Sequence, residues 1–115
     1  MFGVIKINQD APNFSLDGIL GEGKSKVYEL NHFQNKWLLV FFYSGDFNPK
    51  SNQEISELNQ LYPEFKSRGC EVVAISTDSI LSHLNWLKSL NKKLDFPLLS
   101  DKHHAAAIDY NVFEV

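Results

Sequence analysis

The sequence has a single cysteine, Cys70, which excludes an internal disulfide bond and a thiolate metal cluster built from one chain. It also lacks a long hydrophobic run, because the longest, Trp37–Tyr43, has seven residues where a membrane helix needs about 20. Positive charge is not in excess: 11 Lys and Arg stand against 14 Asp and Glu, which argues against nucleic-acid binding. No basic stretch followed by an apolar segment opens the chain. We therefore expect a cytoplasmic protein that binds neither nucleic acid nor membrane.

The composition is typical of one folded globular domain. Of the 115 residues, 43% are hydrophobic, 13% aromatic and 22% charged. This length lies within the usual size of a domain, about 100–150 residues, and no repeat or low-complexity segment interrupts it. We expect a single domain over residues 1–115.

Hydrophobic spacing predicts strands that alternate with helices. Strands are expected at residues 13–16, 26–30, 37–43, 71–76 and 96–99, and helices over 55–65, 79–90 and 102–110. The apolar run 37–43 is typical of a strand buried on both faces of a central parallel sheet. Pro63 is expected to bend its helix. Because strands and helices alternate, we expect parallel crossovers and an α/β fold.

Six segments of the chain occur in the order and spacing of peroxiredoxins. They are APNFSL, KWLLVFFY, DF, GCEVVAISTDS, SHLNWL and PLLSD, and they cover the chain from about Ala11 onward. On these segments the sequence resembles the alkyl hydroperoxide reductase/thiol-specific antioxidant family, and within it the typical two-cysteine subgroup. The resemblance implies a thioredoxin-like fold with an N-terminal hairpin, contacts between copies in an oligomer, a hydroperoxide substrate, and no cofactor.

The family motif P-x-x-x-T-x-x-C falls on residues 44–51. The motif proline falls on Ser44, the threonine on Asn48 and the peroxidatic cysteine on Ser51, so all three positions have changed. By resemblance, the helper arginine, the resolving cysteine and the closing strands and helix of the family are expected beyond Val115. We therefore expect a C-terminally truncated version of the fold.

Two functions stay open for such a chain. In the family, a cysteine thiolate attacks the hydroperoxide and becomes a sulfenic acid. Ser51 in place of that cysteine favours a non-catalytic thioredoxin-fold module. The alternative is an antioxidant oxidoreductase, a thiol-dependent peroxidase that is active in a longer or cysteine-bearing form.

Several of these residues also have purely structural interpretations. Ser51 opens an S-x-x-E capping box, so we expect it to cap the following helix rather than to act as a nucleophile. Cys70 directly precedes a strand and is interpreted as a structural thiol. By resemblance, Tyr43, Asp46 and Phe47 belong to the active-site pocket. A buried strand also explains Tyr43, and for the pair Asp46 and Phe47 we favour packing alone.

The histidines do not indicate a metal site. His83 and Trp86 are expected to pack at a helix surface. His103 and His104 are adjacent, and neighbouring side chains on a helix point about 100° apart, so the two do not easily bind one ion. We expect a solvated helix start there, with no metal ligands.

The expected truncation has a consequence for the strand at 37–43. By resemblance, one edge of this strand pairs with the strand at 71–76, and the other pairs with strands beyond the present C-terminus. A long apolar edge left unpaired is a template for pairing with another chain. We expect strand pairing with a second molecule or marginal stability, unless the sequence is a fragment of a longer protein.

Overall fold

The computed structural model describes residues 8–21, 24–91 and 93–112. Its elements are β1 (Ser15–Ile19), β2 (Lys26–Glu29), the 3-10 helix η1 (Leu30–Phe33), β3 (Trp37–Phe42), α1 (Pro49–Ser67), β4 (Cys70–Ser76), α2 (Ile80–Leu90), β5 (Leu98–Ser100) and α3 (Ala105–Asp109). The predicted alternation of strands and helices is confirmed. The boundaries differ in β1 and β5, which begin two residues later than expected, in α1, which begins well before residue 55, and in α3, which is shorter than the expected 102–110.

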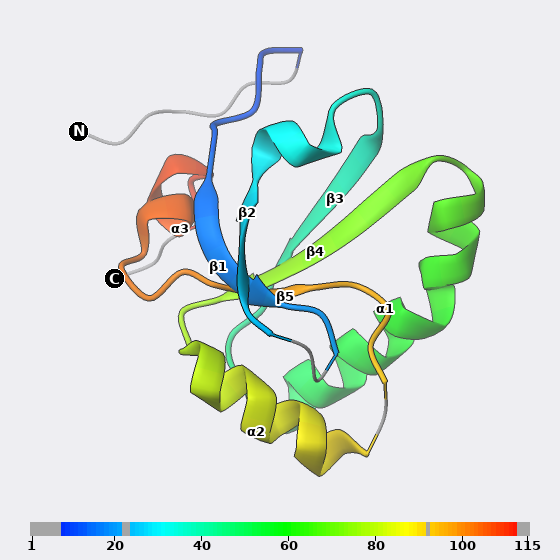
Figure 1. Ribbon diagram of the computed structural model, residues 1–115, viewed down its shortest axis with the longest axis vertical. Helices are drawn as coiled ribbons and strands as arrows, with labels where there is room; N and C mark the ends of the chain where they lie inside the picture. The colour runs from blue at the N-terminus through cyan, green and yellow to red at the C-terminus, as the bar shows by residue number, and fades with distance from the viewer. Residues whose placement is uncertain (1–7, 22–23, 92, 113–115) are drawn as a thin grey trace.

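The strands form one mixed sheet with the order β2-β1-β5-β4-β3 (Figure 1). β1 and β2 make the expected N-terminal hairpin, and β1 also pairs antiparallel with β5. β4 lies parallel to both β5 and β3. The predicted parallel neighbours, 37–43 and 71–76, are therefore adjacent strands.

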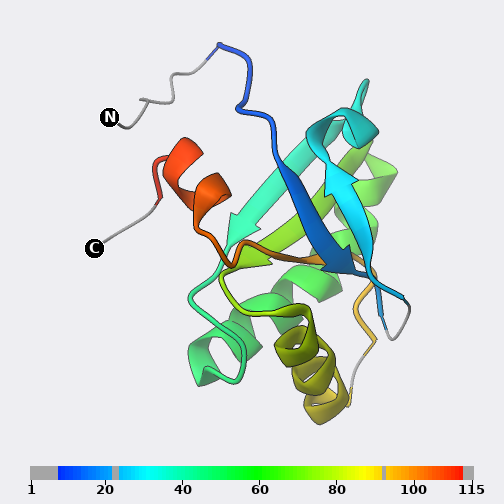
Figure 2. The ribbon, with the colours of Figure 1, turned by 60° about the vertical axis from the view of Figure 1, so that its left-hand side comes forward.

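Helices cover both faces of the sheet, with α1 and α2 on one face and α3 on the other (Figures 1 and 2). Each face has its own hydrophobic core. The first core joins the sheet to α1 and α2 and includes the fully buried Ile55 and Trp86. The second joins the sheet to η1 and α3 and includes Val73 and Leu99. β4 lies between β5 and the edge strand β3, and its residues 72–75 are completely buried.

β3 is an edge strand in the described part of the chain. Its residues 38–42 are half-buried, and Trp37 is 79% exposed. The prediction of a strand buried on both faces is therefore wrong for this chain. The reason is that β3 has one hydrogen-bonded neighbour, β4, among the described residues, so its second edge lacks a strand that would cover it.

α1 begins earlier than the sequence pattern predicts. Its N-cap is Asn48, whose side chain accepts hydrogen bonds from the backbone N–H of Lys50 and Ser51. Pro49 follows as the first helical residue, a position where its missing N–H costs nothing and its fixed φ suits the helix. The prediction that Ser51 caps this helix is therefore wrong. The helix continues through Pro63.

Candidate functional site

The motif positions gather where β3 ends and α1 begins. Tyr43 extends β3, since its N–H donates to the carbonyl oxygen of Ile75 on β4. The chain then turns through residues 44–48, which we call the 44–48 loop, into α1. The fold brings Ser44 and Ser51 together, with their hydroxyl oxygens 3.3 Å apart. Ser44 is exposed, whereas the Ser51 side chain is completely buried.

Asn48, which sequence analysis places at the motif threonine, directs its side chain to the backbone at the start of α1. Its Oδ1 accepts from the N–H of Lys50 at 2.9 Å and from the N–H of Ser51 at 3.4 Å. Both acceptor contacts serve the start of the helix. In this structure the side chain of Asn48 acts as a helix cap.

A buried hydrogen-bond network fastens the 44–48 loop to α2. The carboxyl group of Asp46 accepts from Tyr43 OH at 2.8 Å and from Ser82 OH at 2.8 Å. Its Oδ2 also lies 2.7 Å from Nδ1 of His83, and both of these side chains are completely buried. The backbone N–H of Asp46 donates to the carboxylate of Asp78 at 2.8 Å.

Tyr43 is a hydrogen-bond donor in this network. Burial raises the pKa of its phenol far above the ordinary value, and the negative charge of Asp46 raises it further. The ring stacks on Trp86 with centroids 5.4 Å apart, and the Trp86 indole N–H donates to Asn52 Oδ1 at 2.6 Å. Tyr43 therefore stays protonated and joins the loop to the core under α2.

Sequence reasoning missed the part that α2 plays here. His83 and Trp86 were expected at a helix surface, and both are completely buried, so that prediction is wrong. Their spacing of three residues puts them on one face of α2, the face that packs on the sheet. The available signal was a histidine on the apolar face of a helix, but its partner Asp46 lies 37 residues away.

Asp46 and Phe47 have different environments, although they are neighbours. The buried side chain of Asp46 fits the packing interpretation. Phe47 is 56% exposed and has a φ of 62°, a left-handed conformation that is rare for a bulky residue. Packing alone therefore does not explain Phe47.

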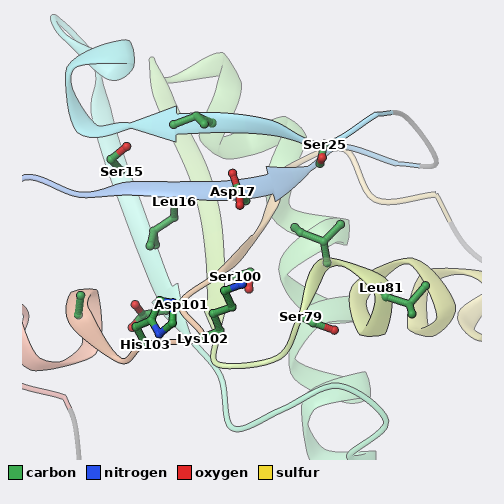
Figure 3. A pocket seen from close by; sticks show the side chains of 13 residues that line it. Ser15, Leu16, Asp17, Ser25, Ser79, Leu81, Ser100, Asp101, Lys102 and His103 are labelled. Atoms are coloured by element: carbon green, nitrogen blue, oxygen red, sulfur yellow. The ribbon is translucent and has the colours of Figure 1, made fainter.

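Two of the hollows in the described fold bear on the residues predicted from the sequence. One, of about 530 Å³, lies at the carboxyl ends of β3 and β4 and is lined in part by Tyr43 and Ser44. The other, of about 680 Å³, lies between the β1–β2 hairpin and the start of α2, and its lining includes Lys102 and His103 (Figure 3). The first hollow touches the motif positions, and the second contains none of them.

The single thiol and the single arginine lie far from this site. Cys70 begins β4, opposite Trp37 at the start of β3, whereas the site follows the other end of these strands. A strand of seven residues puts the two ends about 20 Å apart. Arg68 is the C-cap of α1, about 25 Å along the helix axis from Ser51.

Neither a metal centre nor a membrane span occurs among the described residues. They contain no group of three or more His, Cys, Asp or Glu placed to hold a metal ion. His103 and His104 precede α3. His104 is the N-cap residue of α3 and has left-handed backbone angles. No described helix is both long enough and apolar enough to cross a bilayer.

The architecture and the layout of the site define a class. A mixed sheet with an N-terminal hairpin, parallel β3 and β4, and a loop leading into α1 is the thioredoxin-like fold of peroxiredoxins. It is similar to the reduced 2-Cys peroxiredoxin of Plasmodium vivax, with a TM-score of 0.88 and 29% identity over 94% of this chain and 70% of that one. The AhpC/TSA family model matches residues 7–115, and the chain belongs to that family.

Two further proteins illustrate the range of relatives. The thioredoxin peroxidase of Fasciola hepatica is 33% identical over 116 residues, which are 96% of this chain and 59% of that protein. Plasmodium yoelii Prx1a modified at its N-terminus, which forms an artifactual octamer, has a TM-score of 0.85 and 29% identity over 95% of this chain and 66% of that one. The chain spans about half the length of the curated relatives it matches, from 44% to 63% in the proteins compared.

Proposed function

We propose that this chain is a non-catalytic peroxiredoxin-fold module, which keeps the scaffold of its family without the peroxidatic thiol. The observation that carries the proposal is Ser51, a completely buried hydroxyl at the position of the reacting cysteine. A hydroxyl is far less acidic than a thiol and needs an adjacent base to become a nucleophile. Among the described residues, the partner of Ser51 Oγ is the hydroxyl of Ser44, which is no such base.

The remaining thiol supports the same proposal. Cys70 is half-buried at the opposite end of the sheet, and its Sγ lies 3.4 Å from the carbonyl oxygen of Glu71. A reactive cysteine needs a helix N-terminus or a nearby cation that stabilises its thiolate. The position of Cys70, at the start of a strand, supplies no helix N-terminus.

One observation favours a second candidate function. Residue 51 lies in the first turn of the 19-residue helix α1, where the helix dipole stabilises an anion such as a thiolate. The hollow lined by Tyr43 and Ser44 reaches Ser44, whose hydroxyl oxygen lies 3.3 Å from that of Ser51. A cysteine-bearing or longer form is therefore a candidate thiol-dependent peroxidase for hydroperoxide substrates.

A peroxide-consumption assay with a thiol reductant separates the two functions. The variants are Cys70→Ser, which removes the only thiol, and Cys70→Ser combined with Ser51→Cys. The matched control combines Cys70→Ser with Ser67→Cys, which places a thiol at the exposed end of the same helix. We expect the unmodified chain to consume peroxide no faster than an ordinary thiol, and Cys70→Ser to abolish that rate.

The outcomes are distinct. Turnover by the Cys70→Ser protein would overturn the non-catalytic proposal, because the serine site would then be reactive. A Ser51→Cys variant at least about tenfold faster than its Ser67→Cys control would support the second candidate, since residue 51 lies at the N-terminal end of the helix dipole, which favours a thiolate, and residue 67 lies at the opposite end. Equal rates for the Ser51→Cys and Ser67→Cys variants would contradict the second candidate function, because the position of residue 51 would then give a thiol no added reactivity towards peroxide.

We further propose that the edge of β3 left uncovered by the described strands pairs with a second copy of this chain. The edge is six residues long and entirely apolar, and Trp37 at its start is 79% exposed. Apolar edges of this kind associate through backbone hydrogen bonds. Analytical ultracentrifugation of the chain tests this: we expect a dimer, which Val40→Lys on β3 dissociates, and a stable monomer would contradict the pairing.

A further inference from the structure

A row of three side chains crosses the sheet from the hairpin to β5. In the strand register, Val27 on β2 lies opposite Asp17 on β1, and Asp17 lies opposite Ser100 on β5. Residues that face each other across a strand pair share one face of the sheet. Ser100 follows Leu98, a residue of the first core, by two positions, so the row lies on the face that α2 covers. All three residues of the row line the hollow of about 680 Å³ between the hairpin and the start of α2.

Ser100 is the most buried member of this row. It is 8% exposed, and its hydroxyl group forms no hydrogen bond with any residue that the structure describes. The hydroxyl is not sealed inside the protein, since no fully enclosed side-chain oxygen or nitrogen of the described residues lacks a partner. A nearly buried hydroxyl that opens onto a hollow can donate to, or accept from, a molecule bound there.

Two opposite charges line the same hollow without neutralising each other. Asp17 and Lys102 are both exposed, and within residues 8–21, 24–91 and 93–112 neither side chain forms an ion pair or a hydrogen bond. In the view of Figure 3, Lys102 extends from the connection after β5 toward Ser100. The carboxylate of Asp101, which also lines the hollow, already accepts from two backbone N–H groups of α3. One carboxylate and one ammonium group are therefore available to a ligand.

The start of α2 adds a positive end and an apolar wall. Its N-cap Ser79 and the next two residues line the hollow. The first N–H groups of a helix have no acceptor within the helix, and the dipole is positive at this end. The first turn of α2 has no acidic residue that would offset this end. Leu81 on α2 is 68% exposed and Val27 on β2 is 48% exposed, so two large apolar side chains flank the polar groups.

We propose that this hollow binds a free α-amino acid with an aliphatic side chain. The ammonium group of the ligand binds Asp17, and its carboxylate binds Ser100 and Lys102. The aliphatic side chain packs on Val27 and Leu81. The hollow contains none of the motif positions 44–51, so the proposal does not depend on whether the chain is catalytic.

The charges at the hollow favour a ligand that carries both signs. A simple anion would meet the available carboxylate of Asp17, and a simple cation would meet Lys102 and the positive end of α2. An amino acid presents a carboxylate and an ammonium group together, so each of its charges has an opposite charge in the hollow. The location agrees with this use, because β4 and β5 are parallel and α/β sheets bind ligands outside the carboxyl ends of such strands.

A chemical-shift titration of the nitrogen-labelled 115-residue chain with L-leucine tests the site. We expect saturable shifts at the amides of residues 79–81 and 100–103, with a Kd on the order of 1 mM. Two analogues each lack one charge: 4-methylpentanoate has no ammonium group, and L-leucine amide has no carboxylate. Each should bind at least about tenfold more weakly than leucine. Equal affinity for either analogue, or the absence of saturable shifts at these amides, would overturn the proposal.

Substitutions assign the two ends of the ligand. Asp17→Asn and Lys102→Gln should each weaken leucine binding by about fivefold, and Ser100→Ala by a similar factor. In Asp17→Asn, the preference for leucine over 4-methylpentanoate should also disappear. The matched controls are Asp109→Asn at the end of α3 and Lys88→Gln in the last turn of α2, which make the same charge changes outside the hollow and should leave Kd unchanged. The spectra also report whether each variant is folded. Equal Kd values in folded site variants and their controls would refute the site.

Discussion

Replacing Asn48 by Ala removes the side-chain oxygen that caps α1. This oxygen accepts from the N–H of Lys50 at 2.9 Å and from the N–H of Ser51 at 3.4 Å. Because the first contact is short and the second is long, we expect the loss of one good capping interaction. Such a loss lowers the free energy of unfolding by about 1 kcal/mol, within a range of about 0.5–2 kcal/mol. For a domain of this size, Tm falls by about 4 °C.

Two further variants make this prediction specific to Asn48. Ser51→Ala removes a hydroxyl whose partner, Ser44, is exposed and can bind water instead. Ala is also the better helix former, so we expect a loss below about 0.5 kcal/mol. Asn48→Asp keeps the acceptor and adds a negative charge at the positive end of the helix dipole. It should equal or exceed the stability of the unmodified chain by a few tenths of a kcal/mol, roughly.

Urea unfolding measures these differences. The completely buried Trp86 provides a fluorescence signal that changes when the chain unfolds. Unfolding midpoints at constant m-value then report stability alone. If Ser51→Ala cost as much as Asn48→Ala, the capping box predicted from the sequence would describe the helix start, and the assignment of Asn48 as the N-cap would be refuted.

Two other predictions concern the sheet and its flank. In Gly18→Ala, the added Cβ would overlap the buried side chain of Leu99 and lie 2.8 Å from the Tyr28 ring. We therefore expect the free energy of unfolding to fall by about 1–3 kcal/mol, measured by thermal unfolding. An unchanged Tm would contradict the close packing at Gly18. Burial and the hydrogen bond to Glu71 raise the pKa of Tyr62 to about 12. The native state therefore keeps this proton longer than the unfolded chain, and the resulting stability, complete below about pH 10, is lost as pH rises toward 12. Tyr62→Phe should flatten this part of the stability profile, measured by urea unfolding at each pH, whereas an equally steep profile would refute the linkage.

The kinds of element along the chain follow from short stretches of sequence. Apolar spacing predicted the strands and helices because it reflects contacts that repeat within one element. The parallel pairing of 37–43 with 71–76 followed from the family resemblance and is confirmed. The start of α1 was misplaced because two capping patterns overlap, one beginning at Asn48 and one at Ser51. Asn48 followed by Pro49 suits the helix start better, since proline is well placed at the first helical position.

The sequence by itself determined the family and the α/β alternation, because both depend on residue identity and local order. Only the tertiary structure decided that Ser51 is buried, that β3 lies at an edge, and that Asp46 binds His83. The physical reason is distance along the chain. A hydrogen bond between groups 37 residues apart exists only after the sheet and α2 have brought them together, and no local pattern specifies which buried polar group will meet which.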